Sequence, residues 1–167
     1  MKNLVLTGFM GTGKTTVGKI LAKKLGYRFV DTDIEIEKQE GKSVSALFEL
    51  YGEAGFRDIE ARVVAELSDK KHSVIATGDG VVLREENMKN LRKNGVVVLL
   101  RTDLDTIVQR LADKTDRPLA KGSTPEELAE RLRQREPYYA NHDFAIDIGE
   151  HSPICVADRI ISLFKML

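Results

Sequence analysis

The chain has 167 residues, which is the usual size of one domain and is long enough to bury a core. Hydrophobic residues make up 42% and charged residues 31%, and 26 basic side chains balance 26 acidic ones, so composition indicates no nucleic-acid or membrane partner. A single cysteine, Cys155, excludes an internal disulfide, and no apolar run suits a signal peptide or a membrane span, so we expect a cytoplasmic protein. The apolar neighbours of Cys155 predict that this side chain is buried.

Short apolar runs alternate with longer amphipathic segments along the whole chain. In chain order the pattern predicts strand 4–6, helix 14–25, strand 28–30, helices 34–39, 44–51 and 53–67, strand 73–76, helix 85–93, strand 96–100, helix 104–112, a helix opening at Thr124, strand 144–148 and helix 154–164. This alternation predicts an α/β domain with a mostly parallel sheet. The polar stretch 113–123 is either a mobile segment or a plain surface loop.

A phosphate-binding motif occupies residues 8–15, which read Gly-Phe-Met-Gly-Thr-Gly-Lys-Thr and match G-x-x-x-x-G-K-[ST] in full. A predicted strand precedes the motif and a predicted helix follows it, as nucleotide binding requires. In such a loop the backbone N–H groups and the helix N-terminus face phosphate oxygens. Lys14 can reach the outer phosphates, and the Thr15 hydroxyl can ligate Mg²⁺. The motif therefore predicts nucleotide binding without naming the acceptor of the phosphate.

Acidic and basic side chains follow the predicted strands, where an open α/β sheet binds its ligands. Asp31 and Asp33 come directly after the second strand, so one can hold a metal-bound water and the other can take a proton from a hydroxyl. The alternative for this pair is an Asx turn or a helix cap, with Asp33 directly before the helix. Arg57 and Glu60 share a helix face, as either an anion-binding pair or an ordinary ion pair. Arginines also gather at positions 131, 133 and 135, which fits either a site or a solvated charged helix.

Six motifs in this order resemble those of shikimate kinases. They are the phosphate loop 8–15, Asp31-x-Asp33, Phe56-Arg57-x-x-Glu60, Thr77-Gly78-x-Gly80, Asp116-Arg117-Pro118-Leu119 and Arg135-x-Pro137-x-Tyr139. The resemblance covers nearly the whole chain. It implies transfer of the ATP γ-phosphate to the 3-hydroxyl of shikimate, on the route to chorismate and the aromatic amino acids, with Mg²⁺ as cofactor. It also implies a monomer whose partners are shikimate and ATP or ADP, with no nucleic acid and no membrane.

The fold that the resemblance implies is that of nucleoside monophosphate kinases. Helices cover both faces of a five-stranded parallel sheet with strand order 2-3-1-4-5, which makes three α/β/α layers. The chain would be one kinase domain, 1–167, with a substrate-binding region at about 33–62 and a lid at about 113–123.

The resemblance also implies a role for each site residue. Asp33 would bind the substrate hydroxyls and act as the base, Arg57 and Arg135 would hold the shikimate carboxylate, and Glu60 would orient Arg57. Asp31 would act on Mg²⁺ through water, beside Thr15. The catalytic residues would be Lys14, Asp33 and Arg117. The ATP-binding set would be Gly11, Thr12, Gly13, Lys14, Thr15, Thr16, Arg110, Arg117 and Pro153, and the substrate-binding set Asp33, Arg57, Glu60, Gly78, Asp79, Gly80 and Arg135.

Asp79 departs from the family pattern, which has three consecutive glycines after the third strand and uses the N–H of the middle one to contact substrate. A carboxylate pointing inward there would oppose the anionic substrate. Asp79 can point to solvent or pair with an arginine, it can be an introduced residue, or it can mark a relative with another acceptor such as a neutral polyol. A shikimate kinase impaired by Asp79 therefore remains an alternative, as does a nucleotide-dependent switch with slow turnover.

Overall fold

The computed structural model describes residues 2–112, 124–149 and 151–167. Within these ranges the strands form one five-stranded sheet in the order β2-β3-β1-β4-β5, and each neighbouring pair runs parallel. The strands are β1 (Asn3–Thr7), β2 (Arg28–Asp31), β3 (Ser73–Ala76), β4 (Gly95–Arg101) and β5 (Phe144–Asp147). The strand order implied by the family resemblance is confirmed.

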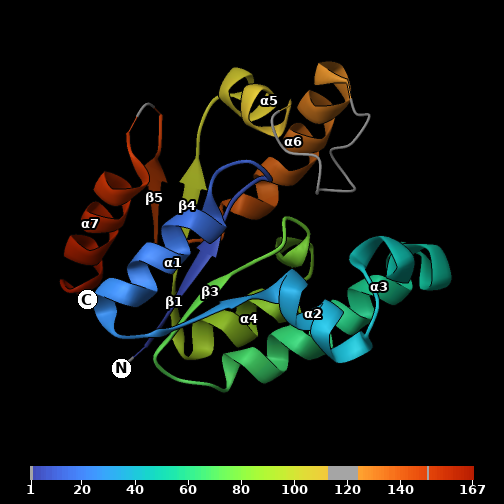
Figure 1. Cartoon of the computed structure of the whole chain (residues 1–167), viewed down its shortest axis with the longest axis horizontal. Coiled ribbons are helices and arrows are strands. Elements are labelled where there is room, and N and C mark those ends of the chain that lie inside the picture. The colour runs from blue at the N-terminus through green and yellow to red at the C-terminus, as the bar shows by residue number, and fades with distance from the viewer. Residues whose placement is uncertain (1, 113–123, 150) are drawn as a thin grey trace.

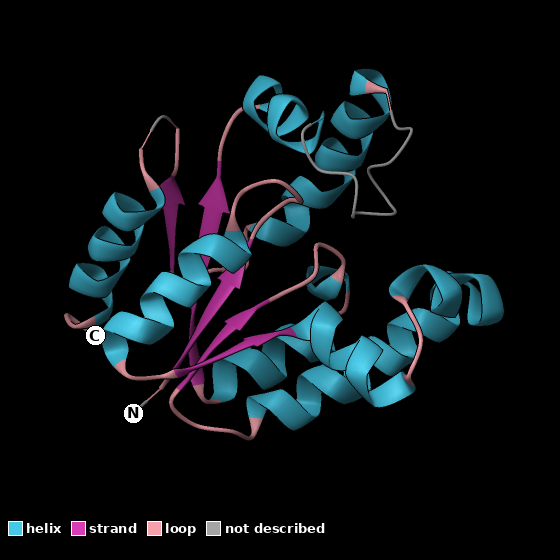
Figure 2. Ribbon diagram, viewed as in Figure 1, coloured by secondary structure: helices cyan, strands magenta, loops and turns pink. Residues whose placement is uncertain are grey.

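Helices cover both faces of this sheet, so the three-layer architecture is confirmed as well (Figure 1). The helices are α1 (Lys14–Leu25), α2 (Thr32–Glu40), α3 (Val44–Ser68), α4 (Glu85–Lys93), α5 (Leu104–Ala112), α6 (Pro125–Tyr139) and α7 (Pro153–Phe164), with a short 3-10 helix η1 (Val81–Leu83). Helices α1 and α7 lie side by side on one face, and α3, α4 and the end of α6 lie on the other (Figures 1 and 2). The carboxyl ends of the strands point toward the loops that begin α1, α2 and η1 (Figure 2).

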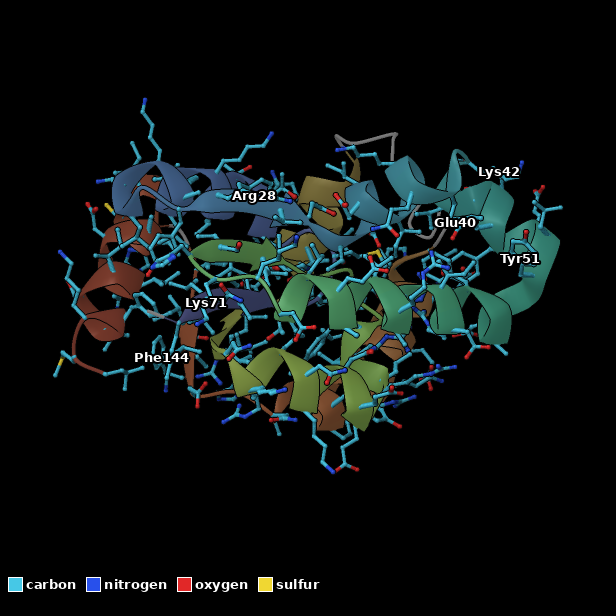
Figure 3. The ribbon with its side chains drawn as sticks, turned by 90° about the horizontal axis from the view of Figure 1, so that it is seen from below. Arg28, Glu40, Lys42, Tyr51, Lys71 and Phe144 are labelled. Carbon is cyan, nitrogen blue, oxygen red and sulfur yellow. The ribbon has the colours of Figure 1, made fainter. Side chains whose placement is uncertain are left out.

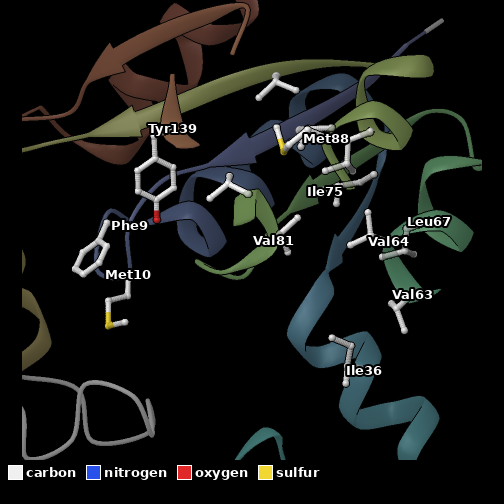
Figure 4. Close-up of a cluster of buried hydrophobic side chains, with 14 of the residues drawn as sticks. Phe9, Met10, Ile36, Val63, Val64, Leu67, Ile75, Val81, Met88 and Tyr139 are labelled. Atoms are coloured by element: carbon white, nitrogen blue, oxygen red, sulfur yellow. The ribbon is translucent and has the colours of Figure 1, made fainter. Parts of the chain in front are cut away.

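The central strand β1 is buried on both sides because each face of the sheet has its own helical layer. Val5 packs with the α3 and α4 layer, whereas Leu4 and Leu6 pack with α1 and α7. Figure 4 shows the first of these two clusters, where Ile36 and Val63 lie at the α2–α3 side and Phe9 and Tyr139 lie beside the phosphate loop. The same hydrophobic cluster therefore reaches from the α2–α3 region to the phosphate loop.

Helices α2 and α3 project from one end of the molecule. Seen from below, Lys42 and Tyr51 lie at that end, far from Phe144 on the edge strand β5 (Figure 3). Helix α3 contains one non-helical residue, Gly52, at φ 71° and ψ 179°. This break separates the two helices predicted at 44–51 and 53–67, and it lets the first part turn away from the sheet.

Two local predictions are wrong. Helix α2 begins at Thr32, so its cap is Asp31 rather than Asp33, and the Asp31 carboxylate accepts the backbone N–H groups of Asp33 and Ile34. Cys155 is exposed rather than buried. Helix α7 turns Val156, Ala157 and Ile160 toward α1, and this spacing leaves Cys155 on the outward side.

Helix α6 opens as predicted, with the Thr124 hydroxyl accepting the backbone N–H of Glu127 at 3.2 Å. None of the helices in the described ranges is long and apolar enough to cross a membrane. The expected lid, 113–123, lies outside the described residues.

Candidate active site

The phosphate loop connects β1 to α1 at the centre of the sheet. Gly11 and Gly13 have φ angles of 83° and 87°, in the left-handed region that favours glycine, and Gly13 is the N-cap of α1. Because this cap has no side chain, the N–H groups of the first helical turn face the loop without obstruction. The loop thus has the shape and the dipole of an anion site.

Polar side chains brace the phosphate loop from inside. The Lys14 ammonium, only 6% exposed, donates to the carbonyl oxygens of Gly8 at 2.5 Å and Phe9 at 3.0 Å. The Thr12 hydroxyl donates to the Phe9 oxygen at 2.8 Å, whereas Thr16 lies exposed on α1. Lys14 therefore provides positive charge within the loop.

The Thr15 hydroxyl and the Asp31 carboxylate meet at the mouth of the loop. Thr15 Oγ1 donates to Asp31 Oδ2 at 3.1 Å, while Asp31 Oδ1 caps α2. Asp31 therefore combines the helix-cap role with a position beside the hydroxyl that could bind a metal. Oxygen donors of this kind suit Mg²⁺, which keeps several waters and uses few protein ligands. The described residues contain no group of three or more His, Cys, Asp or Glu side chains able to hold a metal.

Asp33 lies in the first turn of α2, facing the loop after β3. Burial raises its pKa from the usual range to about 7, with the neighbouring carboxylates Asp31, Glu60 and Asp79 adding to the effect and Lys14 opposing it. A carboxyl group of this pKa holds and releases a proton near neutral pH.

Arg57 and Glu60 form a buried pair on α3. Arg57 Nη1 donates to Glu60 Oε1 at 3.0 Å, and the side chains are 9% and 1% exposed. The guanidinium also lies 5.7 Å and 5.5 Å from the ring centres of Phe48 and Phe56, which stack on each other. Burial raises the pKa of Glu60, although the Arg57 charge opposes the shift. The buried Glu60 carboxylate thus fixes the position of the Arg57 guanidinium.

The loop between β3 and η1 brings Asp33 and Arg57 to one place. A Cβ atom on Gly78 would lie 2.7 Å from Asp33 Oδ1, and a Cβ atom on Gly80 would lie 2.1 Å from Arg57 Nη1. Only glycine allows both approaches. The Gly78 N–H donates to Thr32 Oγ1 at 2.8 Å, which ties the loop to the start of α2.

Asp79, between these glycines, points toward α6. Its Oδ2 lies 3.7 Å from Arg135 Nε, and the two side chains are only 11% and 12% exposed. Of the orientations left open by the sequence, pairing with an arginine is confirmed and solvent exposure is wrong. Arg133, by contrast, is 75% exposed and pairs with Glu130, which supports the ordinary surface reading for that residue.

The structure does not bring every predicted residue to the site. Arg117 falls in 113–123 and lies outside the described residues, as does the side chain of Arg110 on α5. Pro153 is exposed at the first position of α7, directly after the cap Ser152.

Three contributors to the site's frame were missed as such from the sequence. Thr32 anchors Gly78, the Tyr139 hydroxyl donates to the Asp79 carbonyl oxygen at 3.3 Å, and Phe48 underlies Arg57. Tyr139 stood in a recognised motif, but its partner on another element could not be read from that motif. Phe48 gave no such signal, because the break at Gly52 separates it from Phe56 and spacing along a helix does not apply across it.

Comparison with known proteins shows which family this chain belongs to. The family model described as shikimate kinase matches residues 10–165. The chain belongs to the shikimate kinase family. A shikimate kinase of Thermodesulfovibrio yellowstonii is 51% identical over 100% of this chain and 97% of its own, and one of Caldanaerobacter subterraneus is 46% identical over 100% and 98%. The solved shikimate kinase of Acinetobacter baumannii in complex with shikimate is 36% identical, with a TM-score of 0.93 over 99% of this chain and 94% of that one. Family and fold therefore agree over the whole length.

Proposed function

We propose that this chain is an ATP-dependent kinase that transfers the γ-phosphoryl group of ATP to the 3-hydroxyl of shikimate. One observation carries the proposal. The loop 78–80 touches a carboxyl group, Asp33, at one glycine and a buried guanidinium, Arg57, at the next, directly beside the phosphate loop. A hydroxy acid that accepts a phosphoryl group needs one group to take the hydroxyl proton and another to bind its carboxylate, and membership of the shikimate kinase family indicates which hydroxy acid it is.

The nucleotide would bind across the phosphate loop and the start of α1. Backbone N–H groups of residues 11–16 would face the phosphates, and the Lys14 ammonium would leave its loop carbonyls to neutralise phosphate charge. Mg²⁺ would be held by Thr15 and, through water, by Asp31, and it would neutralise charge on the phosphates. The adenine would lie between Arg110 and Pro153, as the resemblance implies.

The acceptor would lie between α2, α3 and α6, in the substrate-binding region that we assign to about 33–62 together with Arg135. Arg57 and Arg135 would hold its carboxylate, and Glu60 would keep Arg57 in place. Asp33 would hold the reacting hydroxyl. Gly78 and Gly80 would let Asp33 and Arg57 lie directly against the loop, which would keep both side chains at the acceptor position.

The chemistry follows from this arrangement. The substrate oxygen forms a bond to the γ-phosphorus, the bond to the ADP oxygen breaks, and the hydroxyl proton passes to the Asp33 carboxylate. A pKa of about 7 for Asp33 suits a group that must be deprotonated before the reaction and must accept a proton during it. Arg117 would contact the transferred phosphoryl group from a lid at 113–123, as the resemblance implies, and closure would exclude water.

We also propose that the chain acts as a single domain, as a monomer and in the cytoplasm. Equal numbers of basic and acidic residues and a single cysteine support this assignment, because neither suggests a nucleic-acid partner or a disulfide-bonded assembly. Light scattering during size-exclusion chromatography should give one 18.7 kDa species. A mass twice that value would contradict the monomer.

The decisive experiment is ADP release from MgATP with and without shikimate. We expect a saturable, shikimate-dependent rate and a phosphorylated product that mass spectrometry detects. The Asp33→Asn variant should bind both substrates and lose turnover by about 100-fold or more. ATP hydrolysis that shikimate does not stimulate would contradict the proposal and would favour a different acceptor or a nucleotide switch.

A further inference from the structure

The Asp79–Arg135 pair is an ion pair without a hydrogen bond. Asp79 Oδ2 and Arg135 Nε are 3.7 Å apart, too far for a hydrogen bond, and both atoms are buried with no hydrogen-bond partner in the described structure. The carboxylate therefore compensates the charge of Arg135 but leaves this donor unused. Buried donors left without a partner cost free energy, so this arrangement favours any ligand that supplies an acceptor.

The charges around the loop 78–80 are unevenly matched. Glu60 is directly bonded to Arg57, whereas Arg135 has Asp79 as its charged partner at the longer distance. Asp33 is a third carboxyl group in this region, and the negative charges of both Glu60 and Asp79 act on it. A carboxylate arriving at Arg135 would therefore enter a region where these three carboxyl groups outnumber the two guanidinium groups, and Asp79 is the carboxyl group paired with Arg135.

The loop keeps Asp79 in this position. The Tyr139 hydroxyl donates to the Asp79 backbone oxygen, the Gly78 N–H is held by Thr32, and Gly80 abuts Arg57. Since the backbone is fixed on both sides, the Asp79 carboxylate cannot move far from Arg135 without a change of side-chain rotamer. A substrate carboxylate must either displace it or share Arg135 with it.

We infer that Asp79 is a resident counter-ion for Arg135 and determines how strongly the site prefers an acceptor that carries a carboxylate over an uncharged one. This inference rests on the proposed function, because it concerns the same acceptor site. Asp79 acts through Arg135 and is a specificity-determining residue. It opposes a carboxylate-bearing acceptor and leaves an uncharged polyol of the same shape unaffected.

The test compares wild-type protein with Asp79→Asn, which keeps the side-chain shape and removes the charge. Binding is measured by calorimetry with shikimate and with the analogue in which a hydroxymethyl group replaces the carboxylate, and turnover is measured with both. For Asp79→Asn we expect shikimate to bind about tenfold more tightly and its KM to fall by a similar factor. The affinity for the hydroxymethyl analogue and the KM for ATP should stay within about twofold.

Asp158→Asn is the matched control, because Asp158 also forms an ion pair but lies on α7, exposed, with Lys24 at 2.6 Å. It should leave every constant unchanged. A second readout is thermal: without ligand, Asp79→Asn should melt at a lower temperature because Arg135 loses its counter-ion, and saturating shikimate should give it a larger stabilisation than it gives wild-type protein.

The outcomes separate the two proposals. Unchanged shikimate affinity in Asp79→Asn, or an equal gain for the uncharged analogue, overturns the inference while shikimate-dependent turnover still supports the function. Tighter shikimate binding without phosphorylation in either protein supports the inference and overturns the function. Absence of shikimate binding in both proteins overturns both.

Discussion

At the scale of single residues, the site depends on buried carboxyl groups held close together. Burial, together with the neighbouring carboxylates Asp31, Glu60 and Asp79, raises the pKa of Asp33 to about 7, and burial raises the pKa of Glu60 as well. Neighbouring basic side chains oppose part of these shifts. Replacing one of these acidic residues should therefore change the stability of the protein or its affinity for substrate. The direction of the change depends on whether the residue lies beside another acid or beside an arginine.

The raised pKa of Asp33 makes the stability of the free protein depend on pH. Between about pH 4 and pH 7 the folded protein binds the Asp33 proton and the unfolded chain has released it, so the free energy of unfolding falls as pH rises through this window. We expect the wild-type protein to lose on the order of 4 kcal/mol relative to Asp33→Asn across it. Urea unfolding of both proteins without metal or nucleotide measures this difference, and parallel pH profiles would contradict it.

Glu60 should act on substrate affinity through Arg57. In Glu60→Gln the guanidinium loses its buried charged partner and keeps the exposed Glu53 at 3.6 Å. It becomes less fixed, so KM for shikimate should rise about tenfold, or ~1.4 kcal/mol, while KM for ATP stays constant. Glu40→Gln provides the matched control, because Glu40 pairs with Arg62 at the surface and should change neither constant. Equal effects of the two changes in steady-state kinetics would rule out this positioning role.

At the scale of elements, the loop between β3 and η1 tolerates little added volume at Gly78 and Gly80. Gly80 and Gly41 provide a comparison between two kinds of strain. A Cβ atom on Gly80 meets Arg57 at 2.1 Å, whereas Gly41 has open space around it but a φ of 67°. Crowding at one glycine should therefore affect the site, and backbone strain at the other should affect only stability.

Gly80→Ala should push the Arg57 guanidinium away from Glu60. We expect a loss of ~1–3 kcal/mol in stability and a KM for shikimate raised by at least tenfold. Gly41→Ala should cost ~1–2 kcal/mol for its left-handed backbone and leave both KM values unchanged. Denaturant unfolding and steady-state kinetics on the two variants test this contrast, and an unchanged KM in Gly80→Ala would refute the crowding argument.

The elements themselves were predictable from the sequence to within a few residues because their periodicity and caps are local. Two failures show the limit. The cap of α2 is Asp31 rather than Asp33, since either aspartate satisfies the local pattern and only the exit angle of β2 decides between them. Cys155 lies beside the apolar residues of α7, and only the packing of α7 on α1 decides which of these neighbouring residues are buried. Cys155 falls on the exposed side. The orientation of Asp79 depends on α6, a distant element, and could not be deduced.

At the scale of the whole molecule, nucleotide binding should couple to global stability. The phosphate loop begins at the carboxyl end of β1, the central strand, so a ligand that holds the loop also holds the middle of the sheet. At 100 times its dissociation constant, MgADP should stabilise the fold by ~2.7 kcal/mol, which raises Tm by about 5–11 °C. Calorimetric melting should show this shift for wild-type protein and little of it for Lys14→Ala. An equal shift in both would contradict the role of Lys14.

Sheet order was deducible only through family resemblance, because apolar strands of similar length do not specify which strand lies next to which. The core, in contrast, could be predicted from the local sequence of β1 and β4. Their uninterrupted apolar runs must be buried by helices on both faces of the sheet. The site is intermediate. Its residues were predictable from motifs, and their burial and partners depended on the fold.

The central position of β1 has a consequence for folding of the chain during its synthesis on the ribosome. Leu4 pairs with Val74 on one side and with Val96 on the other, so β1 leaves the exit tunnel long before either neighbour exists. Until β4 follows, this strand and the glycine loop beyond it have no sheet to join, and nascent chains are then most exposed to aggregation and to chaperones. The nucleotide loop, early in the sequence, is expected to be among the last parts to acquire its shape.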